Sequence, residues 1–458
     1  MSFWRCQLGR IDLYDLLLPV GILAAAPGYL ARSLTQPEYR AHFSERLGIV
    51  PIELAERLRL SARPPVWIQA VSVGEVFLAA SLIDALDGAW AGRPMDATPR
   101  VVLSSTTPAG RASAANLRSD RLAGVSHFPI DWSPFITRWL DTVRPCAFVS
   151  METELWPGLL RQCARRGIPA ALANGRLSQR SCDRYRRFGW LFREPLQAVK
   201  VACMQTEDDA SRARAIGIPA DRVVVTGNMK FDAGATGKTV AQDLRARLGL
   251  PASGTRQVVV AGSTSAGEEE LLLDAMSDLA RNGARAPLLI LAPRHPERFE
   301  EVARMLERRG AVFARRSESR QAAASRKEFD VLLLDTLGEL ASVYGLADAA
   351  YVGGSLVRRG GQNPIEPAAL GVPVVFGPHT ANFAAVTEDL IRAGAAFRVA
   401  DAQELAASLG ALLADAEARN RAGAAGRALV ESNRGATGRT VTCLLRMLER
   451  QGGAVPRD

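Results

Sequence analysis

Short apolar runs alternate with amphipathic stretches along most of this chain. Runs such as 258–261 and 288–291 are apolar at every position. A strand of that kind is typical of a parallel sheet whose two faces are covered by helices. The alternation therefore predicts an α/β protein built from βαβ units. The predicted strands are 66–71, 100–104, 147–150, 170–173, 199–203, 258–261, 288–291, 331–334, 350–352 and 374–376.

The length of the chain indicates more than one domain. A chain of 458 residues exceeds what one ordinary core supports, so two α/β domains are expected. The strand pattern lapses into small polar residues around 231–240, and we interpret this stretch as the hinge between two similarly built domains. The predicted parts are an N-terminal segment 1–34, a Rossmann-like domain 35–232, a second Rossmann-like domain 233–430, and a C-terminal helix and tail 431–458 that packs back across the hinge.

The N-terminal segment is strongly apolar between residues 11 and 31. Asp12 and Asp15 interrupt its start and leave about 16 uninterrupted residues, fewer than the ~20 that cross a bilayer. We expect a monotopic or marginal membrane anchor here, which either spans the membrane or lies on it. A buried core helix is the alternative interpretation.

The positive charge of the chain is concentrated in one segment. The net charge is +9, and residues 161–193 contain nine arginines against one acid, Asp183. A cationic patch of this kind is expected to face a phosphate-bearing partner or an anionic surface. A solvated helix face is the alternative.

The cysteines and histidines give no sign of a metal site or of disulfide bonds. The six cysteines are scattered without a Cys-x-x-Cys pair, and the four histidines are equally dispersed. This spacing fits a reducing cytosol and argues against a zinc site or a disulfide framework.

Residues suited to a nucleotide follow four predicted strands of the second half, and the carboxylate Asp335 is the one that follows strand 331–334. In βαβ domains, function gathers at the carboxyl ends of strands. Hydroxyl and N–H groups offer hydrogen bonds, glycine lets a ligand approach the backbone, and an arginine fork matches a phosphate. The pattern therefore predicts a nucleotide site at the edge of this sheet. Its candidate residues are Ser263, Thr264, Arg294, His295, Gly353 and Gly354.

A short helix after the paired glycines completes this candidate site. Asn363-Pro364-Ile365-Glu366 has the pattern of a helix start, with a cap residue, a proline and an acid in the first turn. Glu366 is therefore either a capping carboxylate or a carboxylate that accepts hydrogen bonds from ribose hydroxyls. The local sequence does not choose between these two interpretations.

The first half carries its own candidates. Ser72, with the N–H groups of Val73 and Gly74, forms a predicted anion-binding nest at a helix start. Glu75 in the first turn either complements the helix dipole or joins this site. Glu152 follows another predicted strand and lies in a loop that Leu-Trp-Pro indicates is ordered.

Several blocks of the chain together resemble the 3-deoxy-D-manno-octulosonate (Kdo) transferases of lipopolysaccharide synthesis. The blocks run in the order of that family and cover about three quarters of the chain. One position departs from the family, because Gln69 stands where a histidine is usual. The matching blocks are SERLG (44–48), WIQAVSVGEV (67–76), SMETELWPGLL (150–160), ANGRLSQRS (173–181), TGNMKFD (226–232), AGSTSAGEEE (261–270), APRHPERF (292–299) and residues 351–377.

The resemblance implies a glycosyltransferase of the GT-B fold, in which two Rossmann-like domains face each other across a cleft. It implies CMP-Kdo as the donor in the second domain and a lipid A precursor, lipid IVA, as the acceptor in the first. It also implies Glu45 as the catalytic base of an inverting single displacement. Arg294 then stabilises the departing phosphate, and Glu366 holds the ribose. No metal or other cofactor and no nucleic acid is implied.

The resemblance also implies a function for the basic patch and for the apolar N-terminus. A phosphorylated lipid acceptor at the cytoplasmic face of the inner membrane suits both features. We therefore predict that Arg176, Arg180 and the arginines that follow contact lipid phosphates or the anionic leaflet. The alternatives are another GT-B enzyme that uses a UDP-sugar, as a transferase or an epimerase, and a non-catalytic protein that binds nucleotides or lipids at the membrane.

Overall fold

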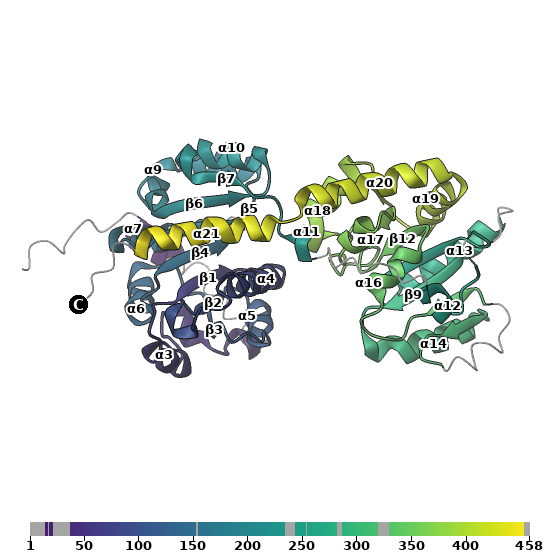
Figure 1. Ribbon diagram of the computed structural model, residues 1–458, viewed down its shortest axis with the longest axis horizontal. Helices are drawn as coiled ribbons and strands as arrows, with labels where there is room; N and C mark the ends of the chain where they lie inside the picture. Colours follow the sequence, from purple (N-terminus) through teal and green to yellow (C-terminus); the bar gives the residue numbers. More distant parts are fainter. Residues whose placement is uncertain are drawn as a thin grey trace, which may run out of the picture. The chain divides into compact units, whose positions relative to one another are not determined.

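The computed structural model describes residues 14–16, 18–21, 37–152, 154–233, 243–252, 254–281, 286–318 and 329–452. The chain divides into two compact units (Figure 1). The first unit comprises Met1–Lys230 and Gly435–Asp458, and the second comprises Phe231–Arg434. The sequence prediction divides the chain after residue 232. Part of the predicted hinge, residues 234–240, lies outside the described residues.

The first unit is built on a seven-stranded parallel sheet in the order β3-β2-β1-β4-β5-β6-β7. Its strands are β1 (Val66–Ala70), β2 (Val101–Ser105), β3 (Leu122–His127), β4 (Ala147–Met151), β5 (Ala170–Gly175), β6 (Val199–Met204) and β7 (Val223–Val225). Its helices are α2 (Phe43–Arg46), α3 (Ile52–Arg59), α4 (Val73–Ala89), α5 (Pro108–Ala115), α6 (Ser133–Val143), α7 (Pro157–Arg166), α8 (Gln179–Arg187), α9 (Gly189–Phe192), α10 (Glu207–Ala215) and α21 (Ala436–Gly452).

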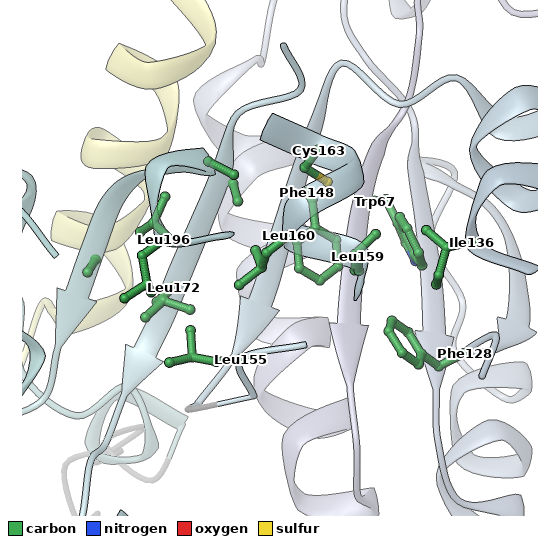
Figure 2. Close-up of a cluster of buried hydrophobic side chains, with 14 of the residues drawn as sticks. Trp67, Phe128, Ile136, Phe148, Leu155, Leu159, Leu160, Cys163, Leu172 and Leu196 are labelled. Carbon is green, nitrogen blue, oxygen red and sulfur yellow. The ribbon is translucent and has the colours of Figure 1, made fainter. Parts of the chain in front are cut away.

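Both faces of this sheet are covered, which explains why its central strands are buried at every position. Successive residues of a strand point to opposite faces. Trp67 of β1 packs with Phe148 on one face, at a ring-centroid distance of 5.0 Å, whereas Ile68 belongs to the core cluster of the other face. Figure 2 shows the first of these clusters, in which Leu159 and Leu160 of α7 lie close to Phe148.

The C-terminal helix α21 belongs to the first unit. Its apolar residues Val441, Leu444 and Met447 join the core cluster that covers one face of the first sheet. Its start is fixed by polar contacts, since Arg439 Nε donates to the Thr226 carbonyl over 2.9 Å and the Thr440 hydroxyl donates to that of Thr226 over 3.2 Å. Helix α21 is therefore part of the wall of a sheet whose last strand in the chain, β7, ends at Val225.

The second unit is also built on a seven-stranded parallel sheet, in the order β10-β11-β9-β8-β12-β13-β14. Its strands are β8 (Val258–Thr264), β9 (Leu288–Pro293), β10 (Phe313–Arg315), β11 (Val331–Leu333), β12 (Ala349–Val352), β13 (Val374–Phe376) and β14 (Ala396–Arg398). Its helices are α12 (Asp243–Arg247), α13 (Glu268–Arg281), α14 (Phe299–Arg308), α16 (Leu340–Val343), α17 (Ile365–Ala369), α18 (Ala384–Arg392), α19 (Ala402–Ala414) and α20 (Ala416–Asn433). A short helix, α11 (Lys230–Ala233), begins at the boundary between the units.

These two parallel sheets confirm the predicted α/β class, and all the predicted strands are present. The prediction missed β3, β7, β10 and β14. These four strands are the edges of the two sheets. An edge strand has a neighbour on one side only, so part of it stays in contact with solvent. The sequences of β3, β10 and β14 accordingly include polar residues, whereas β7 is apolar but only three residues long. In β7 and β14, for example, two of the three residues are exposed.

The described part of the N-terminal segment, residues 14–16 and 18–21, is helical and attached to the first unit. The Tyr14 hydroxyl donates to Asp131 over 2.7 Å, and the Asp15 carboxylate accepts from the Ser133 hydroxyl over 2.7 Å. Among the described residues, no helix has both the length and the apolar character needed to cross a bilayer. The rest of the predicted anchor lies outside the described residues.

Candidate functional site

Most of the predicted site residues follow the strands at which each sheet reverses its order. This reversal lies between β1 and β4 in the first sheet and between β8 and β12 in the second. Open parallel sheets bind ligands at such points, outside the carboxyl ends of the strands. Ser72, Gly74 and Glu75 follow β1, and Glu152 follows β4. In the second unit, Ser263 and Thr264 end β8, and Gly353 and Gly354 follow β12.

The residues after β1 form a reciprocal cap at the start of α4. The Ser72 hydroxyl accepts from the Glu75 N–H over 3.4 Å and donates to a Glu75 carboxylate oxygen over 3.0 Å. The other carboxylate oxygen accepts from the Val71 N–H over 2.8 Å. The Glu75 carboxylate therefore caps the start of α4, and this corresponds to the prediction that Glu75 acts on the helix itself. Val73 and Gly74 remain exposed at this start.

Glu75 is also the most perturbed carboxyl group of this edge. Burial, opposed by the Val71 N–H and reinforced by Glu152 and Glu154, raises the pKa of Glu75 to about 7. Glu152 has a backbone φ of 55°, in the left-handed region, and lies 3.1 Å from Lys230 Nζ. Three carboxyl groups therefore lie near one another at the ends of β1 and β4, where the sequence predicted acceptor-binding residues.

The remaining predicted acceptor residues are Arg176, which directly follows β5, and Arg180, which lies in the first turn of α8. Both side chains are exposed, and neither forms an ion pair with a described residue. Arg184 of the same helix lies close enough to Glu154 to lower the pKa of that carboxyl, although burial leaves the pKa of Glu154 raised. Arg184, in the last turn of α8, therefore lies near the acidic loop that follows β4.

Glu45 is buried at the same edge of the first sheet, on the short helix α2, and is only 3% exposed. Arg111 of α5 donates to both of its carboxylate oxygens, over 2.8 and 2.6 Å. The His127 N–H at the end of β3 donates over 2.6 Å. Burial opposes the ionisation of Glu45, but Arg111 and the His127 N–H outweigh it and hold the pKa of Glu45 below its usual range.

His42 and Arg111 are the parts of this arrangement that the sequence did not reveal. His42 lies three residues before Glu45, and its Nδ1 is 3.3 Å from Glu45 Oε1. Its side chain is 52% exposed, so it lies on the solvent side of the carboxylate. Arg111 lies 66 residues further along the chain, in a helix with no distinctive motif.

In the second unit, the glycine-rich loop after β12 is organised by a buried carboxylate. Glu268, which is fully buried at the start of α13, accepts hydrogen bonds from the N–H groups of Gly354, Ser355 and Leu356 over 2.6, 2.9 and 2.9 Å. It also accepts from the Tyr351 hydroxyl over 2.7 Å. These N–H groups of the loop after β12 are therefore occupied by Glu268.

The paired glycines are required by packing. A Cβ atom at Gly353 would lie 2.4 Å from the Ser263 carbonyl oxygen, because the ends of β8 and β12 approach closely. Gly354 has a φ of +67°, which favours glycine. The sequence predicted that a ligand approaches the backbone here, whereas in the structure it is β8 that approaches Gly353. The donor-binding role of the two glycines stays a prediction.

Thr264 at the end of β8 is part of the protein interior. Its side chain is fully buried, and its hydroxyl donates to Glu269 over 2.8 Å. Glu269 in turn forms an ion pair with Arg298 at 2.6 Å. The Thr264 hydroxyl therefore contacts the protein interior, contrary to the prediction that it faces a ligand. Ser263, by contrast, is partly exposed and has a φ of 56°.

The position of Glu366 is compatible with both predicted roles, a helix cap and an acceptor of hydrogen bonds from ribose hydroxyls. The helix α17 begins at Ile365, whose N–H donates to the Asn363 side-chain oxygen over 3.1 Å, while Asn363 Nδ2 donates to Glu366 Oε1 over 3.2 Å. Glu366 Oε2 has no hydrogen-bond partner among the described residues. Burial raises the pKa of Glu366, and Asn363 and the positive charge of Arg294 lower it in part.

Arg294 and His295 extend from the end of β9 and are exposed. The positive charge of Arg294 lowers the pKa of Glu366, so the end of β9 and the start of α17 lie near each other. His295 is 59% exposed, and its closest acid is Glu297 at 3.8 Å. Arg294 after β9, Ser263 at the end of β8 and Glu366 on α17 thus carry polar atoms without a hydrogen-bond partner among the described residues.

Comparisons with known proteins cover most of the chain. The family model described as 3-deoxy-D-manno-octulosonic-acid transferase (kdotransferase) matches residues 41–233. A 3-deoxy-D-manno-octulosonic acid transferase of Bordetella pertussis is 37% identical over 392 residues, which span 83% of this chain and 86% of that protein. One of Haemophilus influenzae is 34% identical over 429 residues, which span 91% of this chain and 94% of that protein.

A solved structure described as an S. aureus MnaA-UDP co-structure resembles this chain in fold. It is 13% identical, with a TM-score of 0.50 over 84% of this chain and 97% of that one. At this level of identity the likeness concerns the fold alone.

Proposed function

This chain belongs to the 3-deoxy-D-manno-octulosonic acid (Kdo) transferases, and we propose that it takes Kdo from CMP-Kdo and attaches it to a lipid A precursor, lipid IVA. Its activity is that of a glycosyltransferase in lipopolysaccharide biosynthesis. The proposal places the reaction at the cytoplasmic face of the inner membrane, where an acceptor with lipid chains resides.

The proposed arrangement is that of a GT-B enzyme, in which two Rossmann-like domains face each other across a cleft. The acceptor binds to the first unit and the sugar nucleotide to the second. The observation that carries this proposal is that the predicted residues of each set lie at the carboxyl ends of the strands of their own sheet, including the strands between which the strand order reverses. The residues at these strand ends belong to sequence blocks that match the family, such as 67–76 and 261–270.

Glu45 is the proposed catalytic base. It removes the proton from an acceptor hydroxyl as that oxygen attacks the anomeric carbon of Kdo, and the bond from that carbon to the phosphate oxygen of CMP breaks with inversion. A base must be ionised before the reaction, and Arg111 keeps Glu45 in that state. Such a base contributes ~10²–10⁴-fold to the rate.

The acceptor hydroxyl has to replace a present contact of Glu45. Both carboxylate oxygens have partners, namely Arg111, the His127 N–H, the Ser126 hydroxyl and His42. Of these, His42 is the exposed one. We therefore propose that the acceptor approaches from the side of His42, while Arg111 and His127 hold the carboxylate in place.

The donor residues act on the nucleotide. Arg294 is proposed to bind the phosphate of CMP-Kdo and to stabilise the negative charge that develops as CMP leaves. Ser263 and His295 offer further hydrogen bonds from the ends of β8 and β9. Glu366 Oε2 is proposed to accept from the ribose, while Oε1 keeps its contact with Asn363. The carboxylate thereby serves the cap and the ligand together.

The test is to incubate the protein with CMP-Kdo and lipid IVA and to measure the mass of the lipid. The expected result is a lipid heavier by one or more Kdo residues, and the spectrum also counts them. Unchanged lipid would overturn the assignment of donor and acceptor. A binding assay with CMP and UDP then separates the remaining possibilities, because preference for UDP would indicate a UDP-sugar enzyme.

A further inference from the structure

A row of hydrogen bonds runs along the ends of β1 and β2, from the core of the first unit to the loop that follows β2. Gln69 of β1 lies opposite Ser104 of β2 in the register of the two strands, and both side chains are fully buried. The Trp67 indole N–H donates to the Ser104 hydroxyl over 2.7 Å, and this hydroxyl donates to Gln69 Oε1 over 2.5 Å. Gln69 Nε2 then donates to the Thr106 hydroxyl oxygen over 2.9 Å.

The direction of each of these hydrogen bonds follows from the first one. An indole N–H can only donate, so the Ser104 oxygen accepts from Trp67 and keeps its own proton for Gln69. The carbonyl oxygen of the Gln69 amide takes that proton, which turns the amide nitrogen toward Thr106. Because an amide nitrogen only donates, the Thr106 oxygen has to accept. The hydroxyl proton of Thr106 therefore points away from Gln69.

The hydroxyl of Thr106 differs in this respect from those on either side of it. The Ser105 and Thr107 hydroxyls donate to the Val71 carbonyl over 3.2 and 3.0 Å. The Thr107 hydroxyl also accepts from the Gly110 N–H at the start of α5, over 3.1 Å. Thr106 is partly exposed, and its hydroxyl donates to no acceptor within the part of the chain that the structure describes. Its proton is therefore available to a ligand.

The loop that carries Thr106 is joined to the surroundings of Glu45. The Thr106 carbonyl accepts from Arg46 Nη2 over 2.9 Å, and Arg46 directly follows Glu45 in the chain. The Ser105 carbonyl oxygen lies 3.2 Å from His127 Nδ1, and the His127 N–H donates to Glu45. Thr106 thus lies at the same edge of the sheet as the proposed base.

We propose that the Thr106 hydroxyl donates a hydrogen bond to a ring hydroxyl oxygen of the acceptor sugar, and that Gln69 positions it for this contact. The role of Thr106 rests on the proposed function, because it concerns the acceptor of that reaction. A neutral donor suits a neutral sugar oxygen close to the hydroxyl whose proton Glu45 removes. The added contact orients the sugar ring toward Glu45. Gln69 itself is a positioning residue, since it reaches the substrate only through Thr106.

The first test is the kinetics of Kdo transfer to lipid IVA in detergent by the full chain. Thr106→Val replaces the hydroxyl by a methyl group of similar size. The KM for lipid IVA should rise about 3–10-fold, the size of a lost neutral hydrogen bond, and the KM for CMP-Kdo should stay unchanged. The control is Thr142→Val on α6, whose exposed hydroxyl donates to the Arg138 carbonyl. It removes the same group and should keep both KM values.

The second test asks whether Gln69 acts through Thr106. Gln69→Met keeps the length of the side chain and removes both polar atoms, so the KM for lipid IVA should rise. The double variant Gln69→Met/Thr106→Val should then have the KM of Thr106→Val alone, because the contact is already lost. An effect of Gln69→Met that adds fully to that of Thr106→Val would overturn the positioning role.

A conservative variant keeps this test decisive if Gln69→Met does not fold. A neutral imidazole both accepts and donates, so Gln69→His can take the proton of Ser104 and donate to Thr106. The KM of this variant for lipid IVA should therefore stay close to that of the wild type. A rise as large as that of Thr106→Val would overturn the role of Gln69. Thermal unfolding of each variant shows whether it is folded under the conditions of the assay.

The role of Thr106 and the proposed function fail separately. Transfer by the wild type with an unchanged KM for lipid IVA in Thr106→Val would overturn the role of Thr106 and leave the proposed function intact. Absence of transfer by the wild type would refute the proposed function. Calorimetry with lipid IVA in detergent would then decide on Thr106. Binding about 3–10-fold weaker in Thr106→Val would support its role, whereas equal binding, or none in the wild type, would overturn it.

Discussion

Replacing Arg111 with glutamine would leave Glu45 as a buried carboxylate without its cation. The structure gives the pair two charged hydrogen bonds, over 2.8 and 2.6 Å, with side-chain exposures of 15% and 5%. Removal of one partner from a buried pair costs about 3–5 kcal/mol, because the remaining charge is stranded. For a unit of this size, each kcal/mol lowers the melting temperature by roughly 2–4 °C.

The same change should move the pH dependence of the reaction. Glu45 now has a lowered pKa, so it stabilises the fold above its ordinary range, and this stability is lost as the pH falls through the folded pKa. Without Arg111, burial dominates and the pKa of Glu45 rises. The acidic limb of kcat/KM should therefore shift to higher pH in Arg111→Gln, and less so in Arg111→Lys.

Arg121 supplies the control for this experiment. It is buried and forms an ion pair with Asp87 in the same unit, without contact to Glu45. Arg121→Gln should lower the melting temperature and leave the acidic limb of kcat/KM where it is in the wild type. An unmoved acidic limb in Arg111→Gln, at a temperature where the variant is folded, would refute the reasoning that Glu45 is the titrating base held by Arg111.

Three further changes test other parts of the structure. Glu366→Ala should weaken CMP binding in calorimetry by about 10–100-fold, the size of a lost hydrogen bond to a charged group, and unchanged affinity would leave Glu366 as a cap alone. Gly353→Ala places a Cβ atom 2.4 Å from the Ser263 carbonyl oxygen and should destabilise the second unit by about 1–3 kcal/mol in thermal unfolding; full stability would contradict the close approach of β8 and β12. Because the folded pKa of Glu75 is raised to about 7, its contribution to stability is complete below the usual carboxyl range and is lost as the pH rises through 7, by about 3 kcal/mol in all. The stability of the wild type should thus fall relative to Glu75→Gln between about pH 4 and pH 8, and a constant difference would speak against the raised pKa.

The sequence by itself determined the class of fold, the central strands and the family. Central strands are buried on both faces, so their apolar runs are continuous and are visible in a single sequence. The site residues near them were predictable for a related reason. In a parallel sheet, every strand ends at the same edge, so residues far apart in the chain must gather there once the strands are recognised.

The roles of these residues were decided by the tertiary structure. Glu45 was a predicted base, but the arginine that holds it ionised is 66 residues away, and no local pattern marks it. The glycines after β12 were predicted to face a ligand, whereas Glu268, 86 residues before Gly354, occupies the N–H group of that residue. Thr264 likewise turns inward to Glu269.

The physical reason is the same in each of these cases. Burial patterns are local and repeat with the period of a helix or strand, so the sequence displays them directly. A hydrogen bond depends on the distance and direction between two particular atoms, and packing sets both. The sequence therefore determined which residues gather at the edges of the two sheets, and only the fold decided which of their polar atoms are already bound to the protein and which remain free for a substrate.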